Sequence, residues 1–239
     1  MIPLRDDTPR FSTPFVTYFI IILNTLVFFY ELMVGAQSHR ALNSLIFEFG
    51  IVPARLTAAL GGAPHIDLGA AIIPVFTSMF LHAGWLHIIG NMLFLWIFGD
   101  NIEDYLGHFK YLIFYLISGV AAALVHIALN LNSRVPTVGA SGAIAGVMGA
   151  YIVLYPRAKV LTLVFLIVFI TFWWLPAWLF LGYWFLIQFL GGLATNIAET
   201  SQSTGGGVAV WAHVGGFLAG VLLIKLIPAR PRRFSYRYR

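Results

Sequence analysis

Six long apolar stretches, separated by shorter polar ones, dominate the hydrophobic pattern of this chain. Most approach the length of about 20 residues that an α-helix needs to cross a bilayer. The expected segments are Phe15–Val34, Leu81–Gly99, Tyr111–Leu131, Gly139–Leu154, Leu175–Ala194 and Val208–Ile227. The pattern predicts an all-α membrane protein built as a six-transmembrane-helix bundle.

A further apolar stretch, Val160–Trp174, lies between the fourth and fifth segments. It could be a seventh span, or an interfacial or re-entrant stretch that leads into the fifth helix. Pro176 favours a break, because the residue before a proline disfavours the helical conformation. A seventh span would place the two termini on opposite sides of the membrane.

Basic residues favour six spans over seven. With six, both termini and the second and fourth loops share one side, which holds 11 of the 14 Lys and Arg residues. The positive-inside rule assigns that side to the cytoplasm. We expect a cytoplasmic segment 1–14, a membrane domain 15–227 and a basic cytoplasmic tail 228–239.

Composition supports a membrane location. The chain is 60% hydrophobic and 10% charged, with a mean hydropathy of +0.88, whereas soluble domains carry about a quarter charged residues. The net charge of +5 comes mainly from the tail, and we expect it to meet lipid headgroups, not nucleic acid. There is no cysteine, so thiolate chemistry is excluded. Compact loops favour a prokaryotic plasma (inner) membrane.

Two loops differ from plain connectors in composition. Gly35–Phe80 is long and mildly apolar, which suggests a loop that lies partly in the membrane interface. Thr195–Gly207 is small and polar and ends in three glycines, so it could be a flexible lid or a simple connection.

Polar residues gather at one depth of the predicted bundle. Ser141, His213 and His87 lie near the start of the fourth, sixth and second segments, which run in the same direction. At 1.5 Å per residue, all three fall within roughly 10 Å of the outer surface. A lone serine in a membrane helix is usually structural, but a histidine there is a functional candidate with a partner to be named. Imidazole can take a proton from a serine hydroxyl near neutral pH.

Glycines provide a reason for close approach of these helices. Gly142 and Gly146 follow Ser141, and Gly216 and Gly220 follow His213. Such small-xxx-small pairs let helix backbones pack tightly, which would bring the short serine side chain to the histidine.

Hydrogen-bond donors for an oxyanion are also expected at this depth. The backbone N–H of Ser141 lies at a helix N-terminus, where amides are unpaired. His87 and Asn91 are four residues apart and so share one helix face. Without the serine, the same pair would more often hold helices together.

A metal site is the alternative for the histidines. His82, His87 and His213 could be imagined as zinc ligands, but there is no HExxH motif and no carboxylate near that depth. We expect no metal and no cofactor. His126, inside the third segment, is expected to satisfy a neighbouring polar group.

The combination resembles the rhomboid family of intramembrane serine proteases. The matching stretches are His82-Ala-Gly-Trp-Leu-His87-Ile-Ile-Gly-Asn91, Glu103-Asp-Tyr-Leu-Gly107, Gly139-Ala-Ser141-Gly142 and His213-Val-Gly-Gly216-Phe-Leu-Ala-Gly220. The resemblance implies a six-helix bundle and a Ser141–His213 dyad without an acidic third member. It also implies an oxyanion hole of His87, Asn91 and the Ser141 amide, and transmembrane proteins as substrates cut near the outer face. Thr195–Gly207 would then cap the site.

Two positions depart from the family pattern. Many members have an aromatic residue four positions after the serine, where this chain has Ala145, so another group is expected to hold His213. The Trp-Arg pair common in the first loop is missing from Gly35–Phe80. A catalytically inactive relative that binds membrane clients is the alternative to a protease, and a transporter is a third class.

Overall fold

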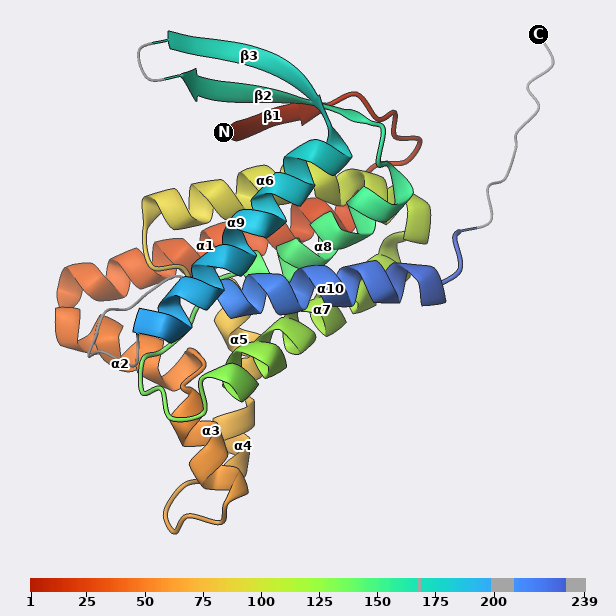
Figure 1. The fold of residues 1–239 in the computed structure, drawn as a ribbon. Coiled ribbons are helices and arrows are strands. Elements are labelled where there is room, and N and C mark those ends of the chain that lie inside the picture. Colours follow the sequence, from red (N-terminus) through yellow and green to blue (C-terminus); the bar gives the residue numbers. More distant parts are fainter. Residues whose placement is uncertain (167–168, 199–208, 231–239) are drawn as a thin grey trace, which may run out of the picture.

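The computed structural model of the protein describes residues 1–166, 169–198 and 209–230. Most of them are helical, and a small sheet lies at one end of the bundle, beside the N-terminus (Figure 1). The elements are β1 (Ile2–Asp6), α1 (Phe15–Gln37), α2 (His39–Phe49), α3 (Pro53–Leu60), α4 (Leu68–Ile72), α5 (Pro74–Thr77), a 3₁₀ turn (Ser78–Phe80), α6 (Trp85–Leu106), α7 (His108–Leu129), α8 (Ser141–Leu154), β2 (Lys159–Leu166), β3 (Phe169–Pro176), α9 (Ala177–Ala198) and α10 (Val210–Leu226). Each of the six predicted apolar segments therefore contains one helix.

Three helices of the described chain are long and apolar enough to cross a membrane, namely α1, α7 and the Ala177–Ala194 part of α9. A fourth span results if Leu68–Phe80 and Trp85–Leu106, which meet at 76°, form one broken span. α8 and α10 are apolar but shorter. The protein is thus a mostly helical membrane protein.

The exposed face of α1 is apolar, as expected for a helix that faces lipid. Its exposed apolar side chains recur every three or four residues and form one stripe, made of Phe15, Phe19, Ile22, Leu26, Phe29 and Met33. Its buried face instead carries the polar residues Thr17, Asn24 and Glu31. In a water-soluble protein the charged and amide side chains would face outward.

Glu103 joins the end of α6 to the beginning of α1. Its carboxylate accepts hydrogen bonds from the N–H groups of Val16 and Thr17, both at 2.8 Å, and from the Thr17 hydroxyl at 2.7 Å. The first N–H groups of a helix have no acceptor within the helix, and a negative charge there also suits the helix dipole. α6 ends at Leu106, beyond the predicted end at Gly99. This extension places Glu103 against α1, where the side chain is fully buried.

The stretch 159–176 forms a β-hairpin, so the prediction of an all-helical protein was wrong here. Strands β2 and β3 pair antiparallel from Lys159↔Pro176 to Leu166↔Phe169, and β1 pairs with β2 to complete a three-stranded sheet. High hydropathy alone suggested a helix or an interfacial stretch, but the residues are largely β-branched and aromatic, which favours strands. Because the antiparallel pairing places Pro176 next to Lys159, the stretch begins and ends at the same end of the sheet and is not a seventh span.

Pro176 separates the hairpin from α9, as the sequence suggested. It is the last residue of β3, and α9 begins at Ala177, whose N–H donates to the carbonyl of Ala158 at 2.7 Å. The break allows the strand direction to change into that of the helix.

The predicted long loop Gly35–Phe80 contains a series of short helices, α2 to α5 and the 3₁₀ turn. Its end supports the residues just before α8. The carbonyl of Ser78 accepts a hydrogen bond from the N–H of Gly139 at 2.8 Å, and Ile51 pairs with Thr137 in an isolated bridge. This loop therefore braces the approach to Ser141.

α8 is the central helix of the bundle (Figure 1). Every residue from Gly142 to Tyr151 is buried, and the helix contacts α6, α7, α9 and α10. A helix that is apolar on all sides belongs in a protein core or in lipid, and here neighbouring helices cover it. Its N-terminus, at Ser141, is therefore held among the neighbouring helices.

Candidate active site

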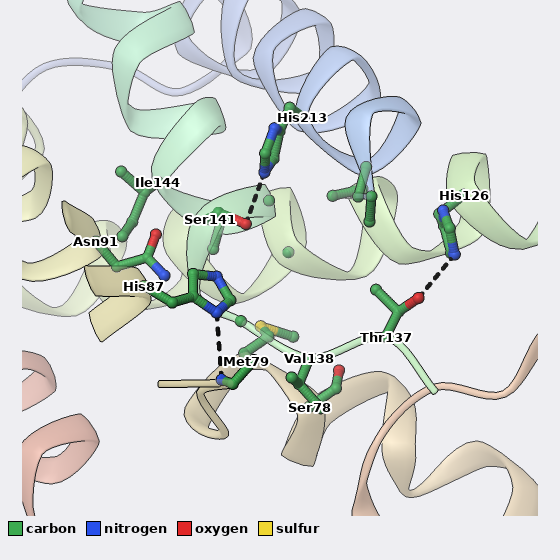
Figure 2. A pocket seen from close by; sticks show the side chains of 18 of the residues that line it. Ser78, Met79, His87, Asn91, His126, Thr137, Val138, Ser141, Ile144 and His213 are labelled. Carbon is green, nitrogen blue, oxygen red and sulfur yellow. Dashed lines mark hydrogen bonds between the residues drawn. The ribbon is translucent and has the colours of Figure 1, made fainter. Parts of the chain in front are cut away.

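Three helices begin around one cavity, and each brings a polar side chain from its first turn. Ser141 is the first residue of α8, while His87 and His213 lie in the first turns of α6 and α10. All three line a cavity of about 960 Å³, together with Asn91 from the next turn of α6 (Figure 2). The structure thus brings together the four residues that the sequence singled out.

Ser141 and His213 are hydrogen-bonded to each other. The serine Oγ lies 2.8 Å from the histidine Nε2, although 72 residues separate them in the chain. His213 is only 8% exposed, so its ring is held in place by packing on most sides. A hydroxyl paired with an imidazole nitrogen in a partly enclosed cavity has the geometry of an activated nucleophile.

Close contact of α8 with α10 makes this pairing possible. A Cβ atom on Gly216 would overlap the carbonyl oxygen of Gly142, and one on Gly220 would overlap the carbonyl oxygen of Gly146. The two backbones therefore touch where the glycines face each other. Larger residues would push the helices apart and would lengthen the distance from Ser141 to His213.

Gly139 shapes the turn into α8. Its φ of +132° lies in a region that residues with a side chain rarely adopt. A Cβ there would also lie 2.7 Å from the His87 ring. Glycine at this position allows the chain to pass close to His87 and places the serine hydroxyl beside the same cavity.

His87 and Asn91 present hydrogen-bond donors to the cavity. The His87 Nδ1 atom accepts a hydrogen bond from the N–H of Ala83 at 3.3 Å, so the ring proton resides on Nε2. Asn91 is 7% exposed, and its Nδ2 has no hydrogen-bond partner within the described residues. An unpaired buried donor costs free energy in the resting protein, so it suits a ligand that arrives later.

The four polar residues of the site lie inside a recognised domain. A family model described as a rhomboid domain matches residues 70–230, more than half of the chain. The chain belongs to the rhomboid family. The matched range contains His87, Asn91, Ser141 and His213, and Ile51 lines the same cavity from outside that range.

Several curated rhomboid proteins are similar to this chain. Rhomboid protein 1, mitochondrial, of Saccharomyces cerevisiae is 33% identical over 65% of this chain and 42% of its own length. RHOMBOID-like protein 1 of Arabidopsis thaliana is 31% identical over 75% of this chain and 41% of its own. Rhomboid protease AarA of Providencia stuartii is 30% identical over 57% of this chain and 50% of its own.

The chain spans about half the length, or less, of the curated relatives it matches. These relatives include proteins named as mitochondrial or chloroplastic as well as a bacterial protein. A prokaryotic plasma membrane therefore gains no support from these relatives, and membrane localisation is what the helices and the family together establish.

In this rhomboid, two residues that the sequence analysis missed contact the candidate base. The Gln188 Oε1 atom lies 2.7 Å from His213 Nδ1, and the Trp184 ring centroid lies 5.7 Å from that of His213. Both residues belong to α9 and are four apart, so they share one face of that helix. The available signal was Gln188 itself, a polar amide within an otherwise apolar predicted span.

Two further histidines of the rhomboid domain have polar partners outside the Ser141–His213 pair, and one of them, His126, also lines the cavity (Figure 2). His126 Nε2 lies 2.9 Å from the Thr137 hydroxyl, which confirms that it satisfies a neighbouring polar group. The backbone N–H of His82 donates to the Glu31 carboxylate at 3.1 Å. Within the described ranges, no three His, Asp or Glu side chains are grouped so that they could hold a metal ion.

Most of the proposed cap, Thr195–Gly207, lies outside the described residues, which resume at Ala209. The basic tail is described only as far as Arg230. The N–H of Arg230 donates to the carbonyl of Tyr105 at 2.8 Å, so the start of the tail lies at the end of α6.

Proposed function

We propose that the protein is an intramembrane serine endopeptidase in which Ser141 is the nucleophile and His213 is the general base. The observation that carries the proposal is the 2.8 Å pairing of the two side chains inside a cavity at the N-terminus of α8. A relative whose name includes the word protease supports it.

The first chemical step is attack on a peptide carbonyl. The Ser141 oxygen forms a bond to the carbonyl carbon while His213 Nε2 takes the hydroxyl proton. The electron pair of the carbonyl moves onto its oxygen and leaves a negative charge there. His213 then donates the proton to the leaving amine, and the C–N bond breaks to give an acyl-enzyme. Water, activated by the same histidine, hydrolyses the ester and restores Ser141.

The developing oxyanion would be stabilised by three donors. These are His87 Nε2–H, the Asn91 amide and the N–H of Ser141, which lies among the first residues of α8 and has no acceptor within the helix. Donors aimed at a charge that appears only in the transition state accelerate the reaction without tightening substrate binding.

The substrates are proposed to be single-span membrane proteins. A helix in lipid hides its peptide carbonyls in internal hydrogen bonds, so a substrate segment must unwind before it can be attacked. The cavity of about 960 Å³, which contains polar groups, would accept such an unwound segment. With α1, α6, α7, α8, α9 and α10 all placed in the membrane and both termini cytoplasmic, the cleavage site would lie near the outer face.

A cleavage assay tests the proposed function. Purified protein in liposomes is incubated with a fluorescent single-span substrate, and the same experiment is run with Ser141→Ala. We expect cleavage by the native protein only, and labelling of the native protein only by a serine-directed fluorophosphonate. Equal cleavage by both forms would refute the dyad, while a native protein that is neither active nor labelled would indicate a membrane-client binding protein.

Asn91→Ala is expected to lower kcat by about 10²- to 10³-fold and to change KM by less than about threefold, because one oxyanion donor is removed. The measurement is steady-state cleavage of the fluorescent substrate over a range of substrate concentrations in the membrane. Asn130→Ala is the matched control, since Asn130 is the C-cap residue of α7, bonds to the His126 carbonyl at 2.8 Å and is not itself a lining residue of the cavity. A rise in KM at constant kcat would assign Asn91 to substrate binding instead.

A further inference from the structure

His213 has two ring nitrogens, and the described structure gives each one a partner. Nε2 faces the Ser141 hydroxyl at 2.8 Å, and Nδ1 faces the Gln188 side-chain oxygen at 2.7 Å. Serine and glutamine thus lie on opposite edges of the ring. The arrangement is a chain of three side chains from α8, α10 and α9.

The chemistry of these partners determines which nitrogen carries the proton. An amide oxygen can only accept a hydrogen bond, so Nδ1 must donate, and the lone pair of the neutral imidazole is then on Nε2. That is the nitrogen that has to accept the serine proton. The opposite tautomer would place a hydrogen on Nε2 and would make the ring unable to act as a base toward Ser141.

We propose that Gln188 is a positioning residue for the reaction, which fixes the tautomer and the orientation of His213. This inference rests on the proposed function of the Ser141–His213 pair. Gln188 occupies the position that the carboxylate holds in the Ser-His-Asp triads of other serine hydrolases. Because its side chain is a neutral amide, it brings no charge into the membrane interior. Nδ1 keeps its proton while Nε2 gains and loses one.

Ala145, four residues after Ser141, cannot support the His213 ring, so this support has to come from another helix. Ala145 is fully buried and carries no ring that could stack on His213. Trp184, one helical turn before Gln188, instead places its ring beside the histidine, with the planes inclined by 39°. The base is therefore supported from α9, whereas many family members carry an aromatic residue for this purpose four positions after the serine.

α9 also packs on α10 beyond the histidine itself. The Phe185 and Phe217 ring centroids lie 4.8 Å apart, and Trp184 approaches the same Phe217 ring at 6.3 Å. These contacts hold Gln188 at hydrogen-bonding distance from Nδ1. The catalytic unit is consequently complete only when α9 lies against α10.

The test compares two substitutions of Gln188 in the full chain reconstituted in liposomes. Gln188→Leu preserves much of the shape but removes the acceptor, and we expect kcat and the fluorophosphonate labelling rate to fall by about 10- to 100-fold with KM nearly unchanged. Gln188→Glu restores an acceptor and is expected to recover most of the labelling rate. Tyr183→Leu, which removes a polar side chain that is 47% exposed on the same helix, serves as the matched control and should retain native activity.

The pH dependence of kcat/KM distinguishes a positioning role of Gln188 from a purely structural one, because loss of packing alone would not shift it. In Gln188→Glu, a carboxylate beside Nδ1 favours the protonated imidazole, so the acid limb of kcat/KM should shift to higher pH. The titratable groups that face His213 from the other described elements are His87 of α6 and His126 of α7, and neither is altered in these variants. A shift seen with Glu but not with Tyr183→Leu therefore reports the Gln188–His213 contact.

Three results would overturn the inference while leaving the proposed function intact. The first is a native protein that cleaves substrate while Gln188→Leu is within about threefold of its kcat. The second is an equal loss in Gln188→Leu and Gln188→Glu together with lowered thermal stability of both, which would assign the residue to packing. The third is an unchanged acid limb in Gln188→Glu. Failure of the native protein itself to cleave or to be labelled would refute the proposed function instead.

Discussion

Replacing His213 with alanine is expected to lower the rate of cleavage by about 10⁴-fold or more, and Ser141→Ala is expected to cost at least as much. Without the imidazole at 2.8 Å, no other described side chain is hydrogen-bonded to the Ser141 hydroxyl to take its proton. Without the hydroxyl, there is no nucleophile for the acyl-enzyme. The measurement is single-turnover cleavage of a fluorescent substrate in liposomes.

The double variant Ser141→Ala with His213→Ala distinguishes a working dyad from two independent contributions. Residues that act as one unit show strongly non-additive losses, so the double variant should be about as inactive as either single one. His39→Ala, at the exposed beginning of α2, is the control for loss of a histidine and should retain full activity. Losses that multiply, or substantial activity of His213→Ala alone, would contradict the dyad.

Gly220→Leu is expected to lower the free energy of unfolding by at least about 4 kcal/mol, with loss of activity. Even the first side-chain atom would overlap the carbonyl oxygen of Gly146, and this atom belongs to the backbone of the central helix. A rigid backbone cannot turn aside as a flexible side chain can. α10 would have to move away from α8, and His213 would move with it.

Thermal unfolding in detergent and fluorophosphonate labelling measure the two consequences. Gly182→Leu is the matched control, because a Cβ on Gly182 of α9 meets no atom within 4 Å. We expect Gly182→Leu to keep its stability within about 1 kcal/mol. If Gly220→Leu were as stable and active as this control, the close approach of α8 and α10 would not be what holds the site together.

Hydropathy located the helices because the length and apolar character of a segment are local properties. Each of the six segments contains a helix, from Phe15–Gln37 to Val210–Leu226. The same measure failed at 159–176, since apolar strands and apolar helices are alike on a hydropathy scale. The choice there depended on β-branched and aromatic residues and on a strand, β1, contributed by the N-terminal end of the chain.

Two polar contacts between helices illustrate what local sequence could not provide. Glu103 was part of a recognised motif, yet its role at the first turn of α1 depends on residues 86 and 87 positions away in the chain. Gln188 was visible as an amide in an apolar span, but its partner could be named only once the rotation of α9 against α10 was known. Distances between helices are set by packing of the whole bundle.

By itself, the sequence determined the membrane character of the protein, the order of its helices and the identities of Ser141, His213, His87 and Asn91 as candidates. These follow from composition, periodicity and residue chemistry along single segments. Only the tertiary structure decided that Ser141 and His213 meet at 2.8 Å and that Gln188 holds the other side of the ring. The physical reason is that a hydrogen bond between helices depends on their mutual approach, and that approach is set by glycine contacts between α8 and α10 and by aromatic packing between α9 and α10.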